Sequence, residues 1–355
     1  MTKIAVVLFN LGGPDGPDDV QPFLKNLFSD PAIIRSPAPV RWFLSRLISR
    51  TRAASARANY ALMGGGSPLK PETRKQAEGL DAELKKRGHT AKSFIAMRYW
   101  KPYAADAVRE VKAWGADRVI LLPLYPQFSS TTTASSLKSW KEARGPAGVA
   151  ICCYPETEKF IAAHARKLIE TWEAAGKPAN VRCLLSAHGL PEIVVKSGDP
   201  YQWQVELTAS KLGPLLPADW EIEICYQSRV GPLQWIGPPT DACIEKAAKD
   251  GKAILLSPIA FVSEHIETLV ELDIEYRHLA DQHGAKTYLR APALGIDAGF
   301  IDTLADLVES TLPETPGAIR SSCSGRICPA NWKDCPNHRA AVAVQNDPAP
   351  NQASS

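Results

Sequence analysis

The sequence lacks long apolar runs. Nowhere in its 355 residues does a run approach the roughly 18 consecutive apolar residues that a membrane-spanning helix requires. The apolar run nearest the N-terminus, Ile4–Phe9, is also too short for the core of a secretion signal. We therefore expect a cytoplasmic protein without a transmembrane helix.

Excess charge and phosphate-binding motifs are also missing. The net charge is only +3 at pH 7, and no basic tract suited to a phosphate backbone occurs, so we expect no nucleic-acid partner. Gly12 and Gly13 follow a strand-like run. However, neither GxGxxG nor GxxxxGK[ST] is present, which argues against a nucleotide cofactor.

The eight cysteines do not suggest a disulfide framework in a chain of this kind. Cys323, Cys328 and Cys335 follow a C-x4-C-x6-C spacing in a stretch punctuated by Pro and Gly, which suggests a metal site. A zinc site of these three cysteines and His338 is one alternative. Three free thiols are another.

Strand-like and helix-like segments alternate along most of the chain, which predicts an α/β fold with parallel sheets. The second half also repeats the first. The turn Leu11–Pro14 has a counterpart in His188–Pro191, and the apolar strand Val119–Leu124 has one in Ala253–Pro258. We therefore predict two related, Rossmann-like domains, each with a parallel sheet flanked by helices.

The predicted boundaries follow from this repeat. The first domain covers residues 1–157 and the second covers 158–312. Residues 313–355 form a tail that carries the cysteine group and ends in a polar stretch expected to be disordered. An insertion at about 35–66 has no counterpart in the second half.

This insertion contains a basic amphipathic helix. Apolar residues at helical spacing are flanked by arginines: Val40, Phe43, Leu44, Leu47 and Ile48, with Arg41, Arg46, Arg50 and Arg52. Such a helix suits a membrane surface or the mouth of an apolar site. Alternatively, its apolar face packs onto the body of the protein.

The most unusual stretch is Ser257–Tyr276. Glu267, Glu271 and Glu275 recur every four residues and form an acidic stripe on a helix, with no Lys or Arg between Glu264 and Tyr276. Like charges on one face repel one another, so the stripe indicates a helix that handles a cation or a proton. An acidic solvent face is the alternative.

His188 ends a predicted strand, and the segment from Glu264 to Glu267 follows a later strand of the same sheet. Because ligands bind beyond the carboxyl ends of parallel strands, we expect these residues to converge. Imidazole beside carboxylate can move protons near neutral pH or bind a divalent metal. The segment from Glu264 to Glu267 does not match the zinc-binding motif HExxH, so the sequence does not indicate a zinc protease.

These motifs resemble those of the ferrochelatases, which insert Fe²⁺ into a porphyrin. The resemblance covers Lys3 to about Glu309 and rests on ten segments: Leu11–Asp15, Gln21–Asp30, Gly64–Pro68, Met97–Tyr99, Tyr125–Gln127, Ser186–Pro191, Gly198–Tyr201, Tyr226–Ser228, Val230–Trp235 and Pro258–Glu275. It implies insertion of Fe²⁺ into protoporphyrin IX by a monomer or homodimer. Coproporphyrin and sirohydrochlorin are the alternative substrates. A haem- or iron-binding carrier or redox sensor is the alternative outside enzymes.

The resemblance also implies roles for individual residues. His188 would accept a pyrrole proton or hold the metal, with Glu267 as its partner carboxylate across the macrocycle. Glu271 and Glu275 would continue a metal or proton path along a π-widened helix, with Glu264 and His265 at its entrance. Porphyrin-binding roles fall on five residues: Leu11, Arg98, Tyr99, Tyr125 and Trp235. The basic helix would be an apolar lip in peripheral contact with the inner membrane.

For the tail, the resemblance implies a [2Fe-2S] cluster on Cys323, Cys328 and Cys335, since some ferrochelatases carry one on a C-terminal cysteine group. In the animal branch a distant fourth ligand follows the Tyr-Pro-Gln motif. The matching residue here is Ser130, so that role does not carry over. Cys153 or Cys152 is the expected substitute.

Overall fold

The computed structural model describes residues 2–229, 231–323 and 325–338. Its first sheet contains β1 (Lys3–Asn10), β2 (Thr90–Met97), β3 (Arg118–Pro123), β4 (Val149–Ile151) and β9 (Ile319–Arg320) in the order β2-β1-β3-β4-β9. Every pairing is parallel. All residues of β1 except the first are buried, as expected for a central strand covered on both faces.

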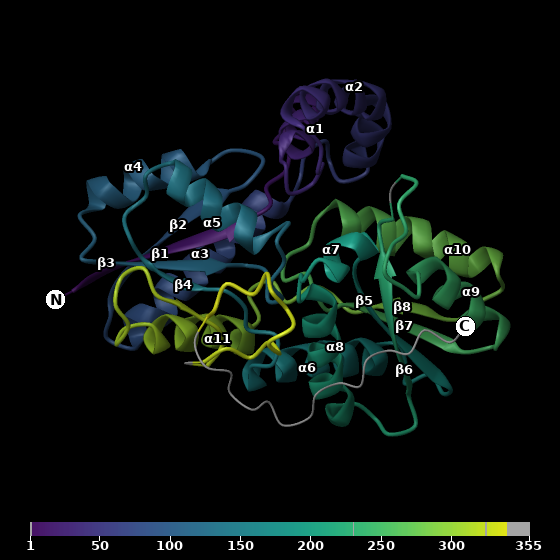
Figure 1. Ribbon diagram of the computed structural model, residues 1–355. Helices are drawn as coiled ribbons and strands as arrows, with labels where there is room; N and C mark the ends of the chain where they lie inside the picture. The colour runs from purple at the N-terminus through teal and green to yellow at the C-terminus, as the bar shows by residue number, and fades with distance from the viewer. Residues whose placement is uncertain (1, 230, 324, 339–355) are drawn as a thin grey trace.

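The second sheet contains β5 (Val181–His188), β6 (Glu221–Gln227), β7 (Ala253–Pro258) and β8 (Tyr288–Arg290) in the order β6-β5-β7-β8. This order is that of β2-β1-β3-β4, and its pairings are again parallel. The predicted internal repeat and α/β fold are therefore confirmed. The two sheets lie side by side, with helices on their faces (Figure 1).

The helices of the first unit are α3 (Leu69–Lys86), α4 (Ala104–Trp114) and α5 (Thr133–Glu142). Helix α6 (Glu158–Ala174) leads to the second unit, which has α7 (Glu192–Lys196), α8 (Tyr201–Leu212), α9 (Thr240–Lys249), a π-helix (Glu267–Glu275) and α10 (Tyr276–Gln282). Short 3₁₀ turns occupy Pro17–Asp19 and Gly213–Leu215.

The insertion forms α2 (Ala38–Ala61), which packs against α1 (Val20–Ser29), and the two helices project from one side of the molecule (Figure 1). The buried face of α2 carries Ser45, Ser49 and Ala53. Its bulky side chains remain outside: Trp42 and Phe43 are 58% and 59% exposed. The alternative in which the apolar face packs onto the body is therefore wrong.

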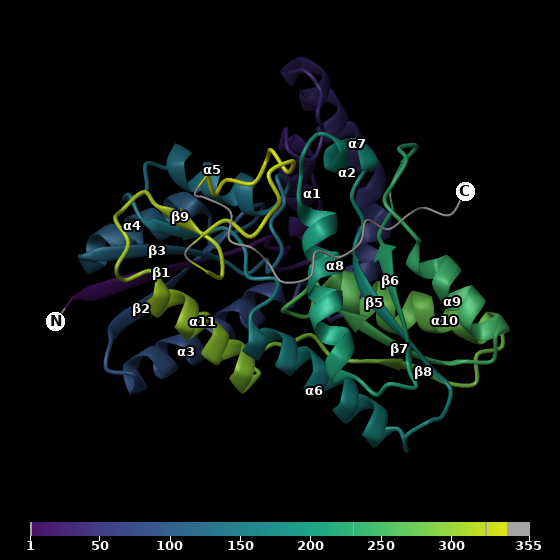
Figure 2. The same cartoon turned by 60° about the horizontal axis from the view of Figure 1, so that its bottom comes forward.

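After β8 the chain returns to the first unit. Helix α11 (Ala298–Ser310) packs on α3 and α6, and β9 then pairs with β4. Figure 2 shows the segment after β9 (yellow) beside the first sheet. The sequence placed residues up to 312 in the second domain and predicted only a tail from 313. A strand of two residues carries too little periodicity to be recognised. The predicted disordered end, 340–355, lies outside the described residues.

No helix in the described ranges combines the length and the apolar character needed to cross a membrane.

Candidate active site

His188 is the last residue of β5, at the carboxyl edge of the second sheet. Its Nδ1 lies 2.6 Å from the carbonyl oxygen of Gly189. A carbonyl can only accept, so Nδ1 carries the proton and donates it. In the neutral ring Nε2 is then left with a free lone pair, which can accept a proton or bind a metal ion.

Glu267 begins the π-helix, and its Oε1 lies 3.9 Å from Nε2 of His188. The resemblance implies that this carboxylate stands across the macrocycle from the histidine, and that role stays a prediction.

Glu271 lies one turn further along the π-helix and is held by four donors. They are Nε2 of Gln227 at 3.1 Å, the backbone N–H of Ser228 at 2.9 Å, Oγ of Ser228 at 2.5 Å and the hydroxyl of Tyr276 at 3.0 Å. These hydrogen bonds fix the position of the Glu271 carboxylate. Burial and this nearby charge raise the pKa of Tyr276, so it remains a donor.

Gln227 connects the His188–Glu267 pair to Glu271. It is paired with His188 across the β5–β6 ladder. Its side-chain amide donates both to the Glu271 carboxylate and, at 3.1 Å, to the backbone oxygen of Glu267. The stripe continues to Glu275, which is exposed. The three glutamates thus run from the half-buried Glu267 to the surface.

Glu264 does not face the His188–Glu267 pair. Its Oε1 accepts from the guanidinium of Arg290 at 2.5 Å and from the backbone N–H of Ala293 at 2.9 Å. Arg290 also pairs with Asp273 on the π-helix. Arg290 therefore ties the residue before the π-helix to the helix itself, and Glu264 has a structural contact that the sequence did not reveal.

His265 also supports the start of the helix. Its Nδ1 accepts from the backbone N–H of Glu267 at 3.0 Å, and its ring packs edge-on against Phe261 with centroids 4.6 Å apart. Desolvation lowers its pKa, so the ring is neutral near pH 7. Its half-buried ring holds the backbone of Glu267 in place.

Two residues of the first unit, Arg98 and Tyr99, follow β2 and converge on Asp30. A nitrogen of Arg98 lies 2.7 Å, and the Tyr99 hydroxyl 2.8 Å, from Oδ2 of Asp30. Burial alone would raise the pKa of Asp30, but hydrogen bonds from Ser135 and Ala32 and the charge of Arg98 outweigh it and lower that pKa. Tyr99 is only 1% exposed. A wall-forming role for Arg98 and Tyr99 stays a prediction.

Two tyrosines that the sequence did not single out approach Glu267. Tyr60, near the end of α2, and Tyr201, at the start of α8, are both buried. Burial and, next, the charge of Glu267 raise the pKa of each. They come from segments far from Glu267 in sequence, so periodicity gives no signal for them. Tyr60 packs with Leu11, which is half-buried.

A cavity of about 480 Å³ opens beside the pair rather than over it. Its lining includes Glu271, Ser228, Asp241, Tyr276 and Trp235. The ring of Trp235 lies 6.4 Å from that of His188, centroid to centroid. Trp235 and Glu271 therefore line the cavity on the side of the His188–Glu267 pair.

The tail cysteines meet two cysteines that follow β4. Cys328 and Cys335 are buried in one apolar cluster with Cys152 and Cys153, and Cys323 packs against it. The sulfurs of Cys152 and Cys153 are 3.5 Å apart. Cys328 lies beside Cys153 and Cys335, which lower its pKa, and Nε2 of Gln204 donates to its sulfur at 3.0 Å. Among the described residues, no three potential ligands already stand in a closed metal-binding geometry.

Comparison with known proteins shows the family of the chain. The family model for ferrochelatase matches residues 3–312. A ferrochelatase of Hyphomonas neptunium is 59% identical over 340 residues, covering 94% of both chains. One of Caulobacter vibrioides is 56% identical over 345 residues, covering 96% of this chain and 99% of its own. The chain belongs to the ferrochelatase family.

Solved structures show the same fold at low identity. SirB from Bacillus subtilis, solved with Fe³⁺, has a TM-score of 0.53 at 12% identity and covers 89% of this chain and 99% of its own. A sirohydrochlorin chelatase SirB from Bacillus subtilis subspecies spizizenii, solved with cobalt, has a TM-score of 0.51 at 11% identity, covering 88% and 96%. Two parallel sheets flanked by helices are thus the chelatase fold.

As a ferrochelatase, the chain is a metal-insertion enzyme of haem biosynthesis rather than a carrier. The structure brings four of the predicted site residues to one edge of the second sheet: His188, Glu267, Glu271 and Trp235. Tyr125 lies beyond β3, and its hydroxyl has no hydrogen-bond partner. The arrangement also fits the predicted π-widened helix, which is observed from Glu267 to Glu275.

Proposed function

We propose that this ferrochelatase inserts Fe²⁺ into protoporphyrin IX and releases two protons. The observation that carries the proposal is the His188–Glu267 pair at 3.9 Å, with Nε2 of His188 free. Two pyrrole N–H bonds break and iron–nitrogen bonds form while iron stays ferrous. Nε2 of His188 accepts one proton, and the Glu267 carboxylate next to it receives the other.

Glu271 and Glu275 carry the exchange between this pair and solvent. Gln227 bridges Glu267 and Glu271, and Glu275 is exposed at the end of the stripe. Glu271 also lines the 480 Å³ cavity together with Asp241. Arg229 of the same lining pairs with Asp241, which leaves the Glu271 carboxylate to favour a cation or a proton over an anion there.

The choice of protoporphyrin rests on charge. Coproporphyrin and sirohydrochlorin carry more carboxylates, and each needs a basic partner. The arginines at and around the site are already paired with carboxylates: Arg229 with Asp241, Arg98 with Asp30, and Arg290 with Glu264 and Asp273. This supports a substrate with few carboxylates.

A turnover assay tests this proposal. Purified protein would be given Fe²⁺ under anaerobic conditions with protoporphyrin IX, coproporphyrin III or sirohydrochlorin, and loss of the free tetrapyrrole spectrum would be followed. We expect protoporphyrin to give a kcat/KM at least about tenfold above the others, a difference of about 1.4 kcal/mol. Faster turnover of either alternative would contradict the assignment.

We also propose that α2 contacts a membrane surface peripherally from the cytoplasmic side. Its exposed apolar residues Val40, Trp42, Phe43 and Leu47 lie on a helix that also carries several arginines. Apolar side chains in the interface and basic ones at anionic headgroups stabilise such binding together. The substrate, being apolar, would then enter from the lipid.

Co-sedimentation with vesicles tests this contact. Phe43→Asp should lower the fraction bound to anionic vesicles severalfold and leave turnover of detergent-dispersed porphyrin within about twofold. Ile296→Asp is the matched control, since Ile296 is 58% exposed but lies just before α11. Equal binding by the two variants would contradict the role of α2.

For the cysteine group we propose a [2Fe-2S] cluster held by Cys323, Cys328, Cys335 and Cys153. These cysteines are suitable ligands for such a cluster, because thiols from two distant segments of the chain converge in one apolar cluster. The side-chain amide of Gln204 also donates to the sulfur of Cys328. Cys153 is favoured over Cys152 because it lies beside Cys328. A bound cluster would supply a one-electron redox couple. His338 is exposed, which weakens the zinc alternative.

Anaerobic purification tests this assignment. The protein should be brown, with sulfur-to-iron charge-transfer bands and about two iron atoms per chain. Cys153→Ala should abolish the bands, whereas Cys152→Ala should keep them. One zinc per chain with no visible bands would favour the zinc site instead.

A further inference from the structure

Gln76 belongs to α3 of the first unit, but its side chain is hydrogen-bonded to the second. It is fully buried. Its Nε2 donates to the backbone oxygens of Val262 at 2.8 Å and Gly295 at 3.1 Å. Its Oε1 accepts from Oγ of Ser263 at 3.0 Å. One side-chain amide thus uses both ends to hold two loops of the other unit.

These loops lead directly to the catalytic carboxylate. Val262 and Ser263 lie in the segment between β7 and the π-helix, and the backbone N–H of Gly295 also donates to Val262 at 2.9 Å. A few residues later, His265 N–H donates to the hydroxyl of Thr268, and His265 accepts from Glu267 N–H. Two sets of hydrogen bonds, at Val262–Ser263 and at His265–Thr268, are therefore joined by a short stretch of backbone and connect Gln76 to Glu267.

The geometry points to Gln76 as a positioning residue for metal insertion. We propose that it fixes the start of the π-helix against the first unit and thereby sets where Glu267 stands relative to His188 and Tyr60. The inference rests on the proposed function, because it concerns the same pair. Its physical basis is burial: an amide with no access to water holds its partners tightly, since an unmade bond costs about 1–3 kcal/mol.

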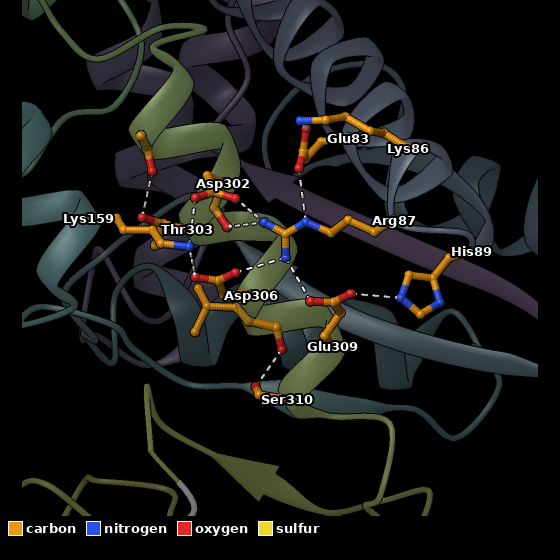
Figure 3. Close-up of polar contacts among 12 residues, drawn as sticks. Glu83, Lys86, Arg87, His89, Lys159, Asp302, Thr303, Asp306, Glu309 and Ser310 are labelled. Carbon is orange, nitrogen blue, oxygen red and sulfur yellow. Dashed lines mark hydrogen bonds and ion pairs between the residues drawn. The ribbon is translucent and has the colours of Figure 1, made fainter.

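A second contact of α3 serves as a control. Arg87, the residue after α3, pairs with Asp302, Asp306 and Glu309 of α11 and with Glu83 of its own helix (Figure 3). Lys159 of α6 pairs with two of the same carboxylates. Within the described part of the chain, neither Arg87 nor Lys159 is hydrogen-bonded to the start of the π-helix. Breaking them should therefore lower stability without moving Glu267.

The test compares kcat, KM and Tm for Gln76→Met and Arg87→Met. Methionine fills a similar volume and removes the polar atoms. We expect Gln76→Met to lose at least about tenfold in kcat, with KM for porphyrin changed less than about threefold, because a misplacement remote from the substrate acts on the chemical step. Arg87→Met should lower Tm as much or more and keep kcat within about twofold.

The variant Gln76→Glu adds a second measurement, the pH dependence of kcat, which a purely structural role of Gln76 would leave unchanged. Its carboxyl group can still accept from Ser263, but it can donate to a carbonyl only when protonated. Its kcat relative to wild type should therefore rise as pH falls, whereas that of Gln76→Met should stay flat. Should Gln76→Met not fold, Ser263→Ala, which removes one of the three bonds, should still lower kcat severalfold.

The inference is overturned if Gln76→Met or Ser263→Ala keeps wild-type kcat. It is equally overturned if Gln76→Met and Arg87→Met lose kcat in proportion to their loss of Tm. These outcomes leave the proposed function untouched. A wild-type protein that metalates no porphyrin would contradict the proposed function itself.

Discussion

Nε2 of His188 and Oε1 of Glu267 lie 3.9 Å apart, at the end of β5 and the start of the π-helix. An imidazole and a carboxylate thus lie next to each other at the carboxyl edge of the second sheet. The role proposed for them is to accept the two pyrrole protons.

The hydroxyl of Ser228 is predicted to tune Glu271. Ser228 has a φ of 64°, so Ser228→Gly keeps the backbone conformation and the N–H donor while removing the 2.5 Å bond from Oγ. We expect kcat to fall about threefold, whereas Glu271→Gln, which removes the charge, should cost at least about tenfold. Steady-state metalation kinetics give both values. A Glu271→Gln enzyme with unchanged kcat would contradict the path along the π-helix.

Arg290 is predicted to be a stability residue rather than a catalytic one. Its side chain is nearly buried and pairs with Glu264 and Asp273. Arg290→Met leaves these carboxylates without their cation and should lower the free energy of unfolding by about 3 kcal/mol. Urea denaturation measures this change. Adding Glu264→Gln should restore part of the loss, and no restoration would show that the pairing is not responsible.

His164 predicts a loss of stability in acid. It is buried beside Phe160, its Nε2 has no partner, and burial lowers its pKa to about 4, partly opposed by Asp297. Between pH 4 and the unfolded pKa of about 6.5 the unfolded state binds more protons, so stability falls as the pH falls through this window. Above it, His164 contributes no pH dependence.

The His164→Leu variant measures that contribution. Between about pH 7.5 and pH 4.5 the wild-type free energy of unfolding should fall by about 2–3 kcal/mol more than that of His164→Leu, following about 1.4 kcal/mol per pKa unit. Parallel urea titrations at the two pH values give the difference. Equal falls in the two proteins would show that His164 is protonated in the folded state.

Much of the fold could be predicted from local patterns. Buried parallel strands read as continuous apolar runs, so the strands from Lys3 and Val181 stand out, and their similar turns indicate the repeat. The convergence of His188 with Glu267 followed from sheet topology, because both follow strands of one parallel sheet. Those predictions depend on short-range signals.

The remaining features depend on contacts between distant residues. The partner of Glu264 is Arg290, on a strand beyond the π-helix, and that of Gln76 is a loop of the other unit. Tyr60 belongs to the insertion, yet it lies near enough to Glu267 for that charge to help raise its pKa. Side-chain contacts of this kind carry no periodicity.

The central claim is that His188 and Glu267 act together in metal insertion. Its most direct test is the initial rate of Fe²⁺ insertion into protoporphyrin IX by His188→Ala, Glu267→Gln and the double variant. The control is His278→Ala, because His278 is an exposed histidine of α10. If the pair acts as one unit, each single variant should lose at least about 100-fold in kcat and the double variant little more, while the control keeps the wild-type rate. Wild-type rates in both single variants would contradict the account.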